Sequence, residues 1–195
     1  SLHRYVGNAD DDTEDFLAVG NSIDEQIEAM DAVCHAVHKT RRTRKKVRLS
    51  FDEWNVWYRA RSGEHLDGNG KFAPPLLEEV YNLEDALVVA QFLNSFLRHA
   101  DSVKIANLAQ IVNVIAPILT RGDEVLNQSI FYPIEMYSKR RNGTALQVRV
   151  EGPSYQSKSF GEATYLDASA ILDGDTLQVF LVNRHPSQSL ETVVD

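Results

Sequence analysis

Residues 103–112 read VKIANLAQIV, a strand-like run in which only Lys104, Asn107 and Gln110 interrupt the apolar side chains. A strand that is apolar on both faces must be covered on both, and a parallel sheet with helices outside it provides that cover. The run therefore predicts an α/β domain, in which helices connect neighbouring strands of one sheet.

Strands and helices alternate on the amino-terminal side of this run. Strand-like segments at 2–6 and 47–51 are followed by helix-like segments at 14–40 and 83–99. The second helix begins after Asn82, a good N-cap residue, and acidic residues occupy the first turn of the helix. The first helix has an apolar stripe at a spacing of three and four residues, and we expect this face to pack on the core. The stripe consists of Ile23, Ile27, Met30, Val33, Cys34 and Val37.

Polar side chains gather where the expected strands end. They are His3 and Tyr5, then Asp52 and Glu53, then Asn107 and Gln110. Barrel enzymes build their active sites at the carboxyl ends of the strands. A nucleotide-binding open sheet is disfavoured, because no glycine-rich phosphate loop follows any of these strands. The pattern therefore favours a barrel.

The character of the chain changes after Asn142-Gly143. Apolar and polar residues now alternate, in Leu146–Val150 and Leu177–Asn183, and the turn sequences Gly152-Pro153 and Asp173-Gly174-Asp175 interrupt the alternation. A period of two with hairpin turns is typical of antiparallel sheet. We place a domain boundary near residue 140 and expect a β-sandwich to begin after it.

Composition excludes several classes of protein. With 43% hydrophobic and 25% charged residues the chain is an ordinary globular protein, and a net charge of -8 disfavours nucleic acid as a partner. No run is long and apolar enough for a membrane span. The single cysteine, Cys34, has no internal partner and is expected to be a buried, inert thiol, which favours a reducing, cytoplasmic setting.

Three charged segments invite metal or phosphate hypotheses, and each has a simpler interpretation. The acidic run 10–15 fits a helix N-terminus better than a metal site. His35 and His38 lack the spacing of a zinc pair and are expected to be partly exposed helix residues. The basic run 41–46 fits a helix C-terminus and a solvated turn. We therefore expect no metal site in this chain.

The segment Asp52–Tyr58, DEWNVWY, combines the side chains that sugar sites use. Carboxylates catalyse, while aromatic faces and amides hold the ring, and this stretch has all three. On chemistry alone, an alternative is almost as good. In that alternative Trp54 and Trp57 are core aromatics, and Asp52 and Glu53 form ion pairs.

The longer segment Leu49–Tyr58, LSFDEWNVWY, resembles the nucleophile motif of glycoside hydrolase family 51, the alpha-L-arabinofuranosidases. The resemblance extends to Ser1–Asn8, Ala73–Glu78, Glu84–Leu87 and Ala109–Pro117, and covers residues 1–140 well. It implies an α/β fold, the C-terminal part of a (β/α)8 TIM barrel at residues 1–140, followed by part of an antiparallel β-sandwich at residues 141–195.

The resemblance also implies the roles of individual residues. Glu53 is the expected catalytic nucleophile, and Asp52 a supporting neighbour. His3, Tyr5, Trp57 and Gln110 are expected to bind the arabinose. The reaction needs no metal or organic cofactor, and the partner is an arabinose-containing oligosaccharide. We expect a homo-oligomer when the polypeptide is complete.

Two departures qualify the resemblance. The acid/base of this clan sits in an Asn-Glu pair, which this sequence lacks. We therefore expect the acid/base upstream, a chain cut at both ends, and no activity in these residues alone. In addition, Val47, Leu49, Phe51 and Glu53 would share one strand face if alternation were strict. A bulge or the strand end must turn Glu53 into the barrel mouth.

Two other functions stay open from the sequence. The same fold could act on another glycoside, such as a β-1,4-glucan. The chain could also be a non-catalytic carbohydrate-binding module whose carboxylates do not react. Turnover of an aryl arabinofuranoside, compared with a cello-oligosaccharide and with binding alone, separates the three.

Overall fold

A parallel three-stranded sheet forms the N-terminal half of the molecule. The computed structural model describes residues 1–59 and 78–195. Strands β1 (Leu2–Val6), β2 (Leu49–Val56) and β3 (Val103–Leu108) pair in the order β1-β2-β3, and both pairs are parallel. The parallel α/β arrangement predicted from the sequence is therefore confirmed for these strands.

Helices connect the three strands, and polar side chains cap two of them. Helices α1 (Thr13–Leu17) and α2 (Gly20–Arg41) follow β1, and α3 (Leu83–Arg98) precedes β3. The Asp12 carboxylate accepts the first-turn N–H of Asp15, and Asn82 forms a reciprocal capping box with Asp85. The capping interpretation of the acidic run is thus confirmed at Asp12.

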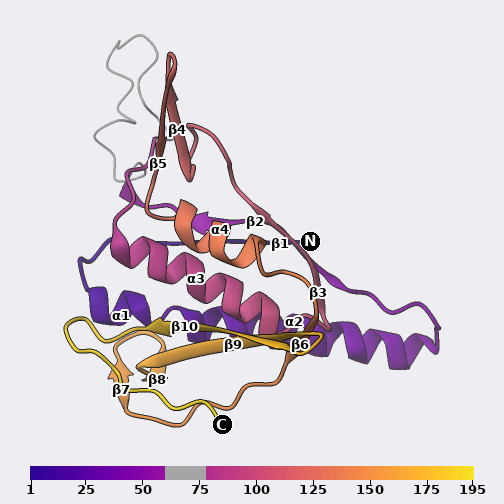
Figure 1. Cartoon of the computed structure of the whole chain (residues 1–195). Helices are drawn as coiled ribbons and strands as arrows, with labels where there is room; N and C mark the ends of the chain where they lie inside the picture. The colour runs from indigo at the N-terminus through magenta and orange to yellow at the C-terminus, as the bar shows by residue number, and fades with distance from the viewer. Residues whose placement is uncertain (60–77) are drawn as a thin grey trace.

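Helix α3 lies between two sheets (Figure 1). One side of the helix packs on β2, and the other on a second, antiparallel sheet of order β10-β9-β6. Its strands are β6 (Thr144–Leu146), β9 (Leu166–Asp173) and β10 (Thr176–Asn183). The β9–β10 hairpin turns at Gly174, whose φ of 57° favours glycine, as the sequence predicts.

Buried polar side chains join α3 to the second sheet. Arg98 donates to Asp167 of β9 at 2.7 Å and to Asp24 of α2 at 2.7 Å. Asn94 donates to the other oxygen of Asp167 at 2.6 Å, and Tyr137 donates to Asn94 at 2.6 Å. These contacts pair the largely buried charges, so α3 is held to α2 and to the second sheet by directional bonds as well as by apolar packing.

Two hairpins and one helix complete the described fold, and the sequence did not predict them. Strands β4 (Ile118–Arg121) and β5 (Glu124–Asn127) form a hairpin that projects from the top of the molecule in Figure 1. Helix α4 (Phe131–Ser138) packs on α3. Strands β7 (Ser154–Ser157) and β8 (Gly161–Thr164) form a second hairpin.

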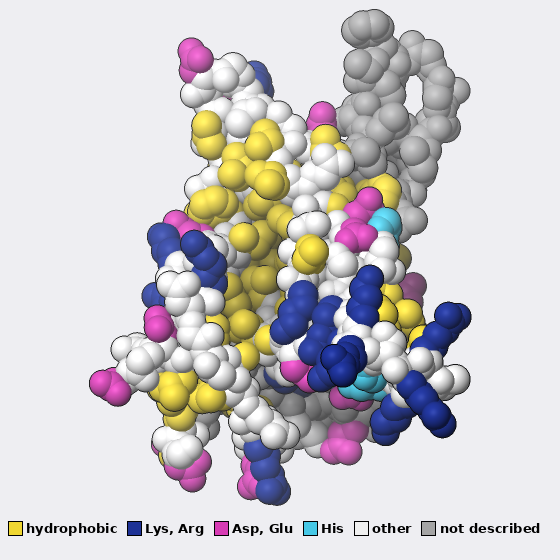
Figure 2. Space-filling model, turned by 90° about the vertical axis from the view of Figure 1, so that its right-hand side faces the viewer, with side chains coloured by type: hydrophobic (Ala, Val, Ile, Leu, Met, Phe, Trp, Pro, Cys, Tyr) yellow, Lys and Arg dark blue, Asp and Glu magenta, His cyan; other side chains and the backbone are white. Residues whose placement is uncertain are grey.

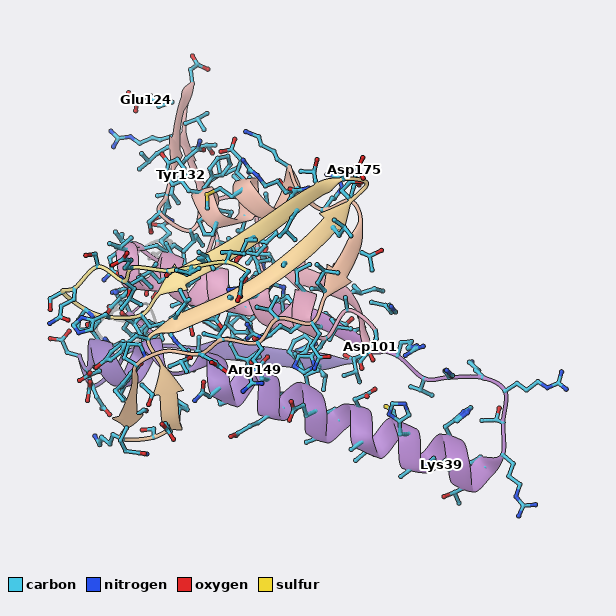
Figure 3. The ribbon with its side chains drawn as sticks, turned by 60° about the horizontal axis from the view of Figure 1, so that its bottom comes forward. Lys39, Asp101, Glu124, Tyr132, Arg149 and Asp175 are labelled. Carbon is cyan, nitrogen blue, oxygen red and sulfur yellow. The ribbon has the colours of Figure 1, made fainter. Side chains whose placement is uncertain are left out.

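The apolar stripe predicted on the first helix is only half buried, so that prediction was wrong for its second half. Ile23 and Ile27 are fully buried, and Cys34 packs partly against the core, whereas Met30, Val33 and Val37 are exposed. A 22-residue helix is about 33 Å long, nearly twice the length of the five-residue strand before it. The far end of α2 therefore projects beyond the sheet, where Figure 3 shows Lys39.

The run 103–112 also differs from its prediction. The strand ends at Leu108, and residues 104–107 are exposed. The strand is therefore not covered on both faces as predicted, and it lies at the edge of this three-stranded sheet. The run Leu146–Val150 is likewise mostly not strand, since β9 pairs only with residues 144–146.

Some predictions concern residues that the structure does not describe. Of the segment Ala73–Glu78, to which the resemblance extends, only Glu78 lies within the described residues. Within the described ranges, no helix is long and apolar enough to cross a membrane.

Candidate active site

A β-bulge at Asp52 decides where Glu53 points. Leu2 pairs with Phe51 and His3 with Glu53, so one step along β1 corresponds to two along β2. The pairing with β3 is irregular over the same residues. An extra residue in one strand reverses the alternation of the side chains that follow it. Of the two devices that the sequence left open, the structure has the bulge and not the strand end.

Aromatic packing shows the consequence of the bulge. Phe51 and Trp54 both face helix α3, where the Phe51 ring lies 5.1 Å from that of Phe96 and the Trp54 ring 5.0 Å from that of Phe92. In a regular strand, residues three apart would face opposite sides. Glu53, which lies between Phe51 and Trp54 in the sequence, points to the side away from α3, and 46% of its side chain is exposed.

Two side chains of β1 meet Glu53 on this open face. The Tyr5 hydroxyl donates to Glu53 Oε2 at 2.9 Å, and His3 Nδ1 lies 3.5 Å from the same oxygen. Arg4, between them in sequence, points the other way and donates to Ser22 of α2 at 2.6 Å. The alternation of β1 thus places His3 and Tyr5 beside Glu53.

Trp57 joins this group through Tyr5. The two rings meet edge to face, with 5.3 Å between their centroids. Trp57 directly follows β2, and its backbone N–H donates to Val6 O at 2.9 Å. Gly7 allows the adjoining chain to approach closely, since a Cβ there would overlap the Tyr58 side chain. The structure therefore brings together Glu53, His3, Tyr5 and Trp57.

Gln110 is placed differently. It is exposed in the segment after β3, whereas the contacts at the site join Glu53 of β2 to Tyr5 and His3 of β1. Asn55 of β2 fixes this segment, because its buried side chain donates to Ala109 O at 2.7 Å and to Ile115 O at 2.6 Å. The sequence analysis missed this role of Asn55. Its place in an otherwise apolar strand end was the available signal.

Asp52 does not share the surroundings of Glu53. It accepts a hydrogen bond from the Ser50 hydroxyl. Hydrogen bonds from Ser1 and Ser50 hold the pKa of Asp52 below its ordinary value. A carboxylate bonded in this way suits the supporting role that the resemblance gave it.

The arrangement suits chemistry at a sugar ring. Glu53 offers an exposed carboxylate whose recorded contacts, in the described parts of the chain, are both to Oε2. Tyr5 holds that oxygen, and the Trp57 ring lies beside the pair. The same ranges contain no group of three or more potential metal ligands. A carboxylate, a phenol and an indole at the carboxyl end of a parallel sheet are features of glycoside hydrolases.

Comparison with known proteins gives the family. The family described as "Alpha-L-arabinofuranosidase C-terminal domain" matches residues 52–195. An intracellular exo-alpha-(1->5)-L-arabinofuranosidase from Halalkalibacterium halodurans is 43% identical over all of this chain and 40% of its own length. One from Bacillus subtilis is 41% identical over all of the chain and 39% of its own. The chain belongs to the alpha-L-arabinofuranosidases of glycoside hydrolase family 51, and it spans about 40% of these relatives.

Solved structures agree with this assignment. A family 51 alpha-L-arabinofuranosidase from Bifidobacterium longum superposes with a TM-score of 0.83 at 28% identity, over 94% of this chain and 38% of that one. An alpha-L-arabinofuranosidase from Thermotoga maritima, solved with arabinose, gives a TM-score of 0.72 at 25% identity, over 93% of this chain and 37% of that one. The fold of this chain is thus similar to that of the corresponding part of family 51 structures.

Proposed function

We propose that this chain supplies the nucleophile half of a retaining alpha-L-arabinofuranosidase that removes terminal arabinofuranosyl groups from oligo- and polysaccharides. The observation that carries the proposal is the position of Glu53. It lies on the open face of a parallel sheet, with Tyr5 bonded to one oxygen and Trp57 packed against the Tyr5 ring. The Oε1 atom is then the one that attacks the anomeric carbon and forms a glycosyl-enzyme.

The second carboxyl belongs to a part of the protein before Ser1. It protonates the leaving oxygen and then activates water, and in a retaining enzyme it lies about 5 to 5.5 Å from the nucleophile. Residues 1–140 are then the C-terminal part of a (β/α)8 barrel, and residues 141–195 part of a β-sandwich. The 195 residues alone are expected to be inactive, because only one of the two carboxyls is present.

Exposed apolar surface supports a larger fold. The edge strand β3 displays Ile105, and Ile111 and Val112 behind it are also exposed. Figure 2 shows a band of hydrophobic side chains down one face, beside a cluster of Lys and Arg. Further barrel strands and helices would pair the open edge and cover such a band.

The names of the relatives favour arabinofuranosides over β-1,4-glucans as substrates. They include exo-alpha-(1->5)-L-arabinofuranosidases and, from Bifidobacterium longum, an exo-alpha-(1->6)-L-arabinofuranosidase 38% identical to this chain. Several are named intracellular, and we propose a cytoplasmic enzyme that forms a homo-oligomer and needs no cofactor.

The test compares substrates and variants of the full-length protein. Hydrolysis of an aryl arabinofuranoside with loss of the reaction in Glu53→Gly supports the proposal. Preference for a cello-oligosaccharide, or glycan binding without turnover, contradicts it. Release of arabinose with inverted configuration would also contradict it, because a double displacement retains configuration.

A further inference from the structure

A buried acid holds the segment that carries Trp57. Glu79, with 1% of its surface exposed, accepts the backbone N–H of Tyr58 at 3.1 Å and that of Arg59 at 2.8 Å, both through Oε1. These are the two residues that follow Trp57 in the chain. Hydrogen bonds from backbone N–H groups to a carboxylate are roughly twice as strong as those between neutral groups.

Neighbouring contacts keep Glu79 itself in place. The Gln128 side chain donates to Glu79 O at 3.0 Å and accepts the N–H of Tyr81 at 3.1 Å. Tyr81 in turn donates its hydroxyl to Val56 O, at the end of β2, at 2.9 Å. The segment 79–81 is therefore bound both to the base of the β4–β5 hairpin and to the strand that leads into Trp57.

The cationic side chain beside Glu79 is engaged elsewhere. Arg59 donates to Asp85, at the N-terminus of α3, at 2.7 Å, and its guanidinium lies 4.3 Å from the centre of the Tyr58 ring. Residues 57–59 are thus held at separate points by Val6 O, by the Glu79 carboxylate and by α3. Of these, Glu79 fixes the backbone immediately after the indole.

We propose that Glu79 is a positioning residue, whose carboxylate sets the orientation of the Trp57 ring against Tyr5 and so shapes the sugar subsite next to Glu53. The inference rests on the proposed function for the roles of Trp57 and Glu53. The Glu79 carboxylate meets the segment that carries Trp57 at the two backbone N–H groups that follow this residue. It acts through the backbone of residues 58–59.

The expected effect falls on binding more than on turnover. A misplacement of about 1 Å near a site costs up to about a hundredfold in activity. Trp57 contacts the sugar ring before and during reaction, so its displacement should raise KM with little change in kcat. We expect Glu79→Ala to raise KM for an aryl arabinofuranoside by about ten- to a hundredfold and to lower kcat less than about threefold.

The conservative variant separates the hydrogen bonds from the charge. Glu79→Gln keeps an oxygen that can accept both N–H groups, and we expect its KM within about threefold of the unaltered enzyme, since the geometry persists while only the charge-assisted part is lost. Glu79→Asp keeps the charge but withdraws the oxygens by one methylene, so it should raise KM as Glu79→Ala does. It replaces Glu79→Ala if that variant does not fold.

A double-mutant cycle in the full-length enzyme tests the proposal. If Glu79 acts through Trp57, then Trp57→Ala combined with Glu79→Ala should have the KM of Trp57→Ala alone. Asn94→Ala is the matched control, because it removes a buried hydrogen bond between α3 and β9, which involves neither residues 57–59 nor residues 79–81. Its effect on KM should be small and should not depend on Trp57.

Two results would overturn the inference. One is a double variant whose KM is the product of the two single effects. The other is a Glu79→Gln variant as impaired as Glu79→Ala. If the enzyme hydrolyses arabinofuranosides and Glu53→Gly abolishes this activity, either outcome contradicts only the role of Glu79 and leaves the proposed function standing. An unaltered enzyme without that activity defeats the proposed function instead.

Discussion

The two sheets that flank α3 each carry a carboxylate on their middle strand, and the two carboxylates have opposite surroundings. Asp167 of β9 faces the helix and has 9% of its side chain exposed, and both of its oxygens accept bonds, from Arg98 and Asn94. Glu53 of β2 faces away from the helix with 46% exposed. Its contacts within the described chain are to one oxygen, from Tyr5 and His3.

This difference separates a structural acid from a candidate reactive one. An oxygen that already accepts strong hydrogen bonds from a buried cation is a poor nucleophile and inaccessible to a sugar. A carboxylate with one oxygen held and the other open is oriented and can still attack. The same residue chemistry therefore has different uses on the two sheets, and the bulge at Asp52 is what turns Glu53 to the open face.

Removing the acid on the open face should have the largest effect. In the full-length enzyme Glu53→Gly should lower kcat by about 10⁴-fold or more, because covalent catalysis is lost, while binding suffers far less. Azide should restore part of the activity on an activated aryl arabinofuranoside and give a glycosyl azide of inverted configuration. A variant that keeps more than about a tenth of the rate and shows no rescue would remove Glu53 from the nucleophile position.

Removing the acid on the helix-facing side should destabilise the fold and leave the chemistry intact. Asp167→Asn replaces one of the two carboxylates that Arg98 contacts, and losing a hydrogen bond to a charged group costs about 2 kcal/mol of unfolding free energy. Denaturant unfolding of the full-length protein measures this loss, with Glu53→Gly as the comparison that should change stability little. If Asp167→Asn lowered kcat of the folded enzyme as Glu53→Gly does, the distinction between the two acids would fail.

A smaller effect is expected at the hydroxyl that holds Glu53. Tyr5→Phe removes one hydrogen bond to a charged group, worth about 1.5 kcal/mol or somewhat more, and should lower kcat/KM about tenfold. Tyr155→Phe is the matched control, because its hydroxyl donates to the backbone oxygen of Glu14 in α1 and not to Glu53. Equal losses in the two variants would contradict a specific role for Tyr5.

The smallest prediction concerns acid stability at the interface of α2 and α3. Burial acts to raise the pKa of Asp24, but hydrogen bonds from His99, Arg98 and Ser95 outweigh it and hold the pKa below its ordinary value. A lowered folded-state pKa gives stability that is present above the unfolded value, about 3.9, and is lost as the pH falls through the folded value.

Asp24→Asn should therefore cost about 1 kcal/mol at neutral pH and less in acid, where the unaltered protein has lost that contribution too. Denaturant unfolding near pH 7 and about pH 3 gives the two values. The mutational cost should shrink at the lower pH. A cost that grows in acid would show that Asp24 is not the group responsible.

Local chemistry in the sequence predicted the features that depend on few residues. The N-cap at Asn82 and the hairpin at Gly174 follow from neighbouring side chains and were correct. His3 and Tyr5 were placed beside Glu53 by the alternation of a short strand together with the family resemblance. The two-residue period of a strand largely decides such contacts, because it puts alternate side chains on one face.

Features set by distant partners could not be read in the same way. The bulge at Asp52 depends on pairing with both β1 and β3, which a single strand does not reveal. Met30, Val33 and Val37 have helical spacing, but their burial depends on how far the sheet extends under α2. Glu79 gave no signal of its own, because its partners lie some twenty residues earlier in the chain.

The most direct test of the central claim is to trap the covalent intermediate on the full-length enzyme. An arabinofuranoside with a good leaving group and fluorine at C2 should form the glycosyl-enzyme quickly and release it slowly, because the electron-withdrawing fluorine destabilises an oxocarbenium-like transition state. Peptide mass spectrometry should then find one fluoro-arabinosyl group, attached at Glu53. A label on another carboxylate, or a turnover that leaves no covalent adduct and inverts the anomeric centre, would contradict the account.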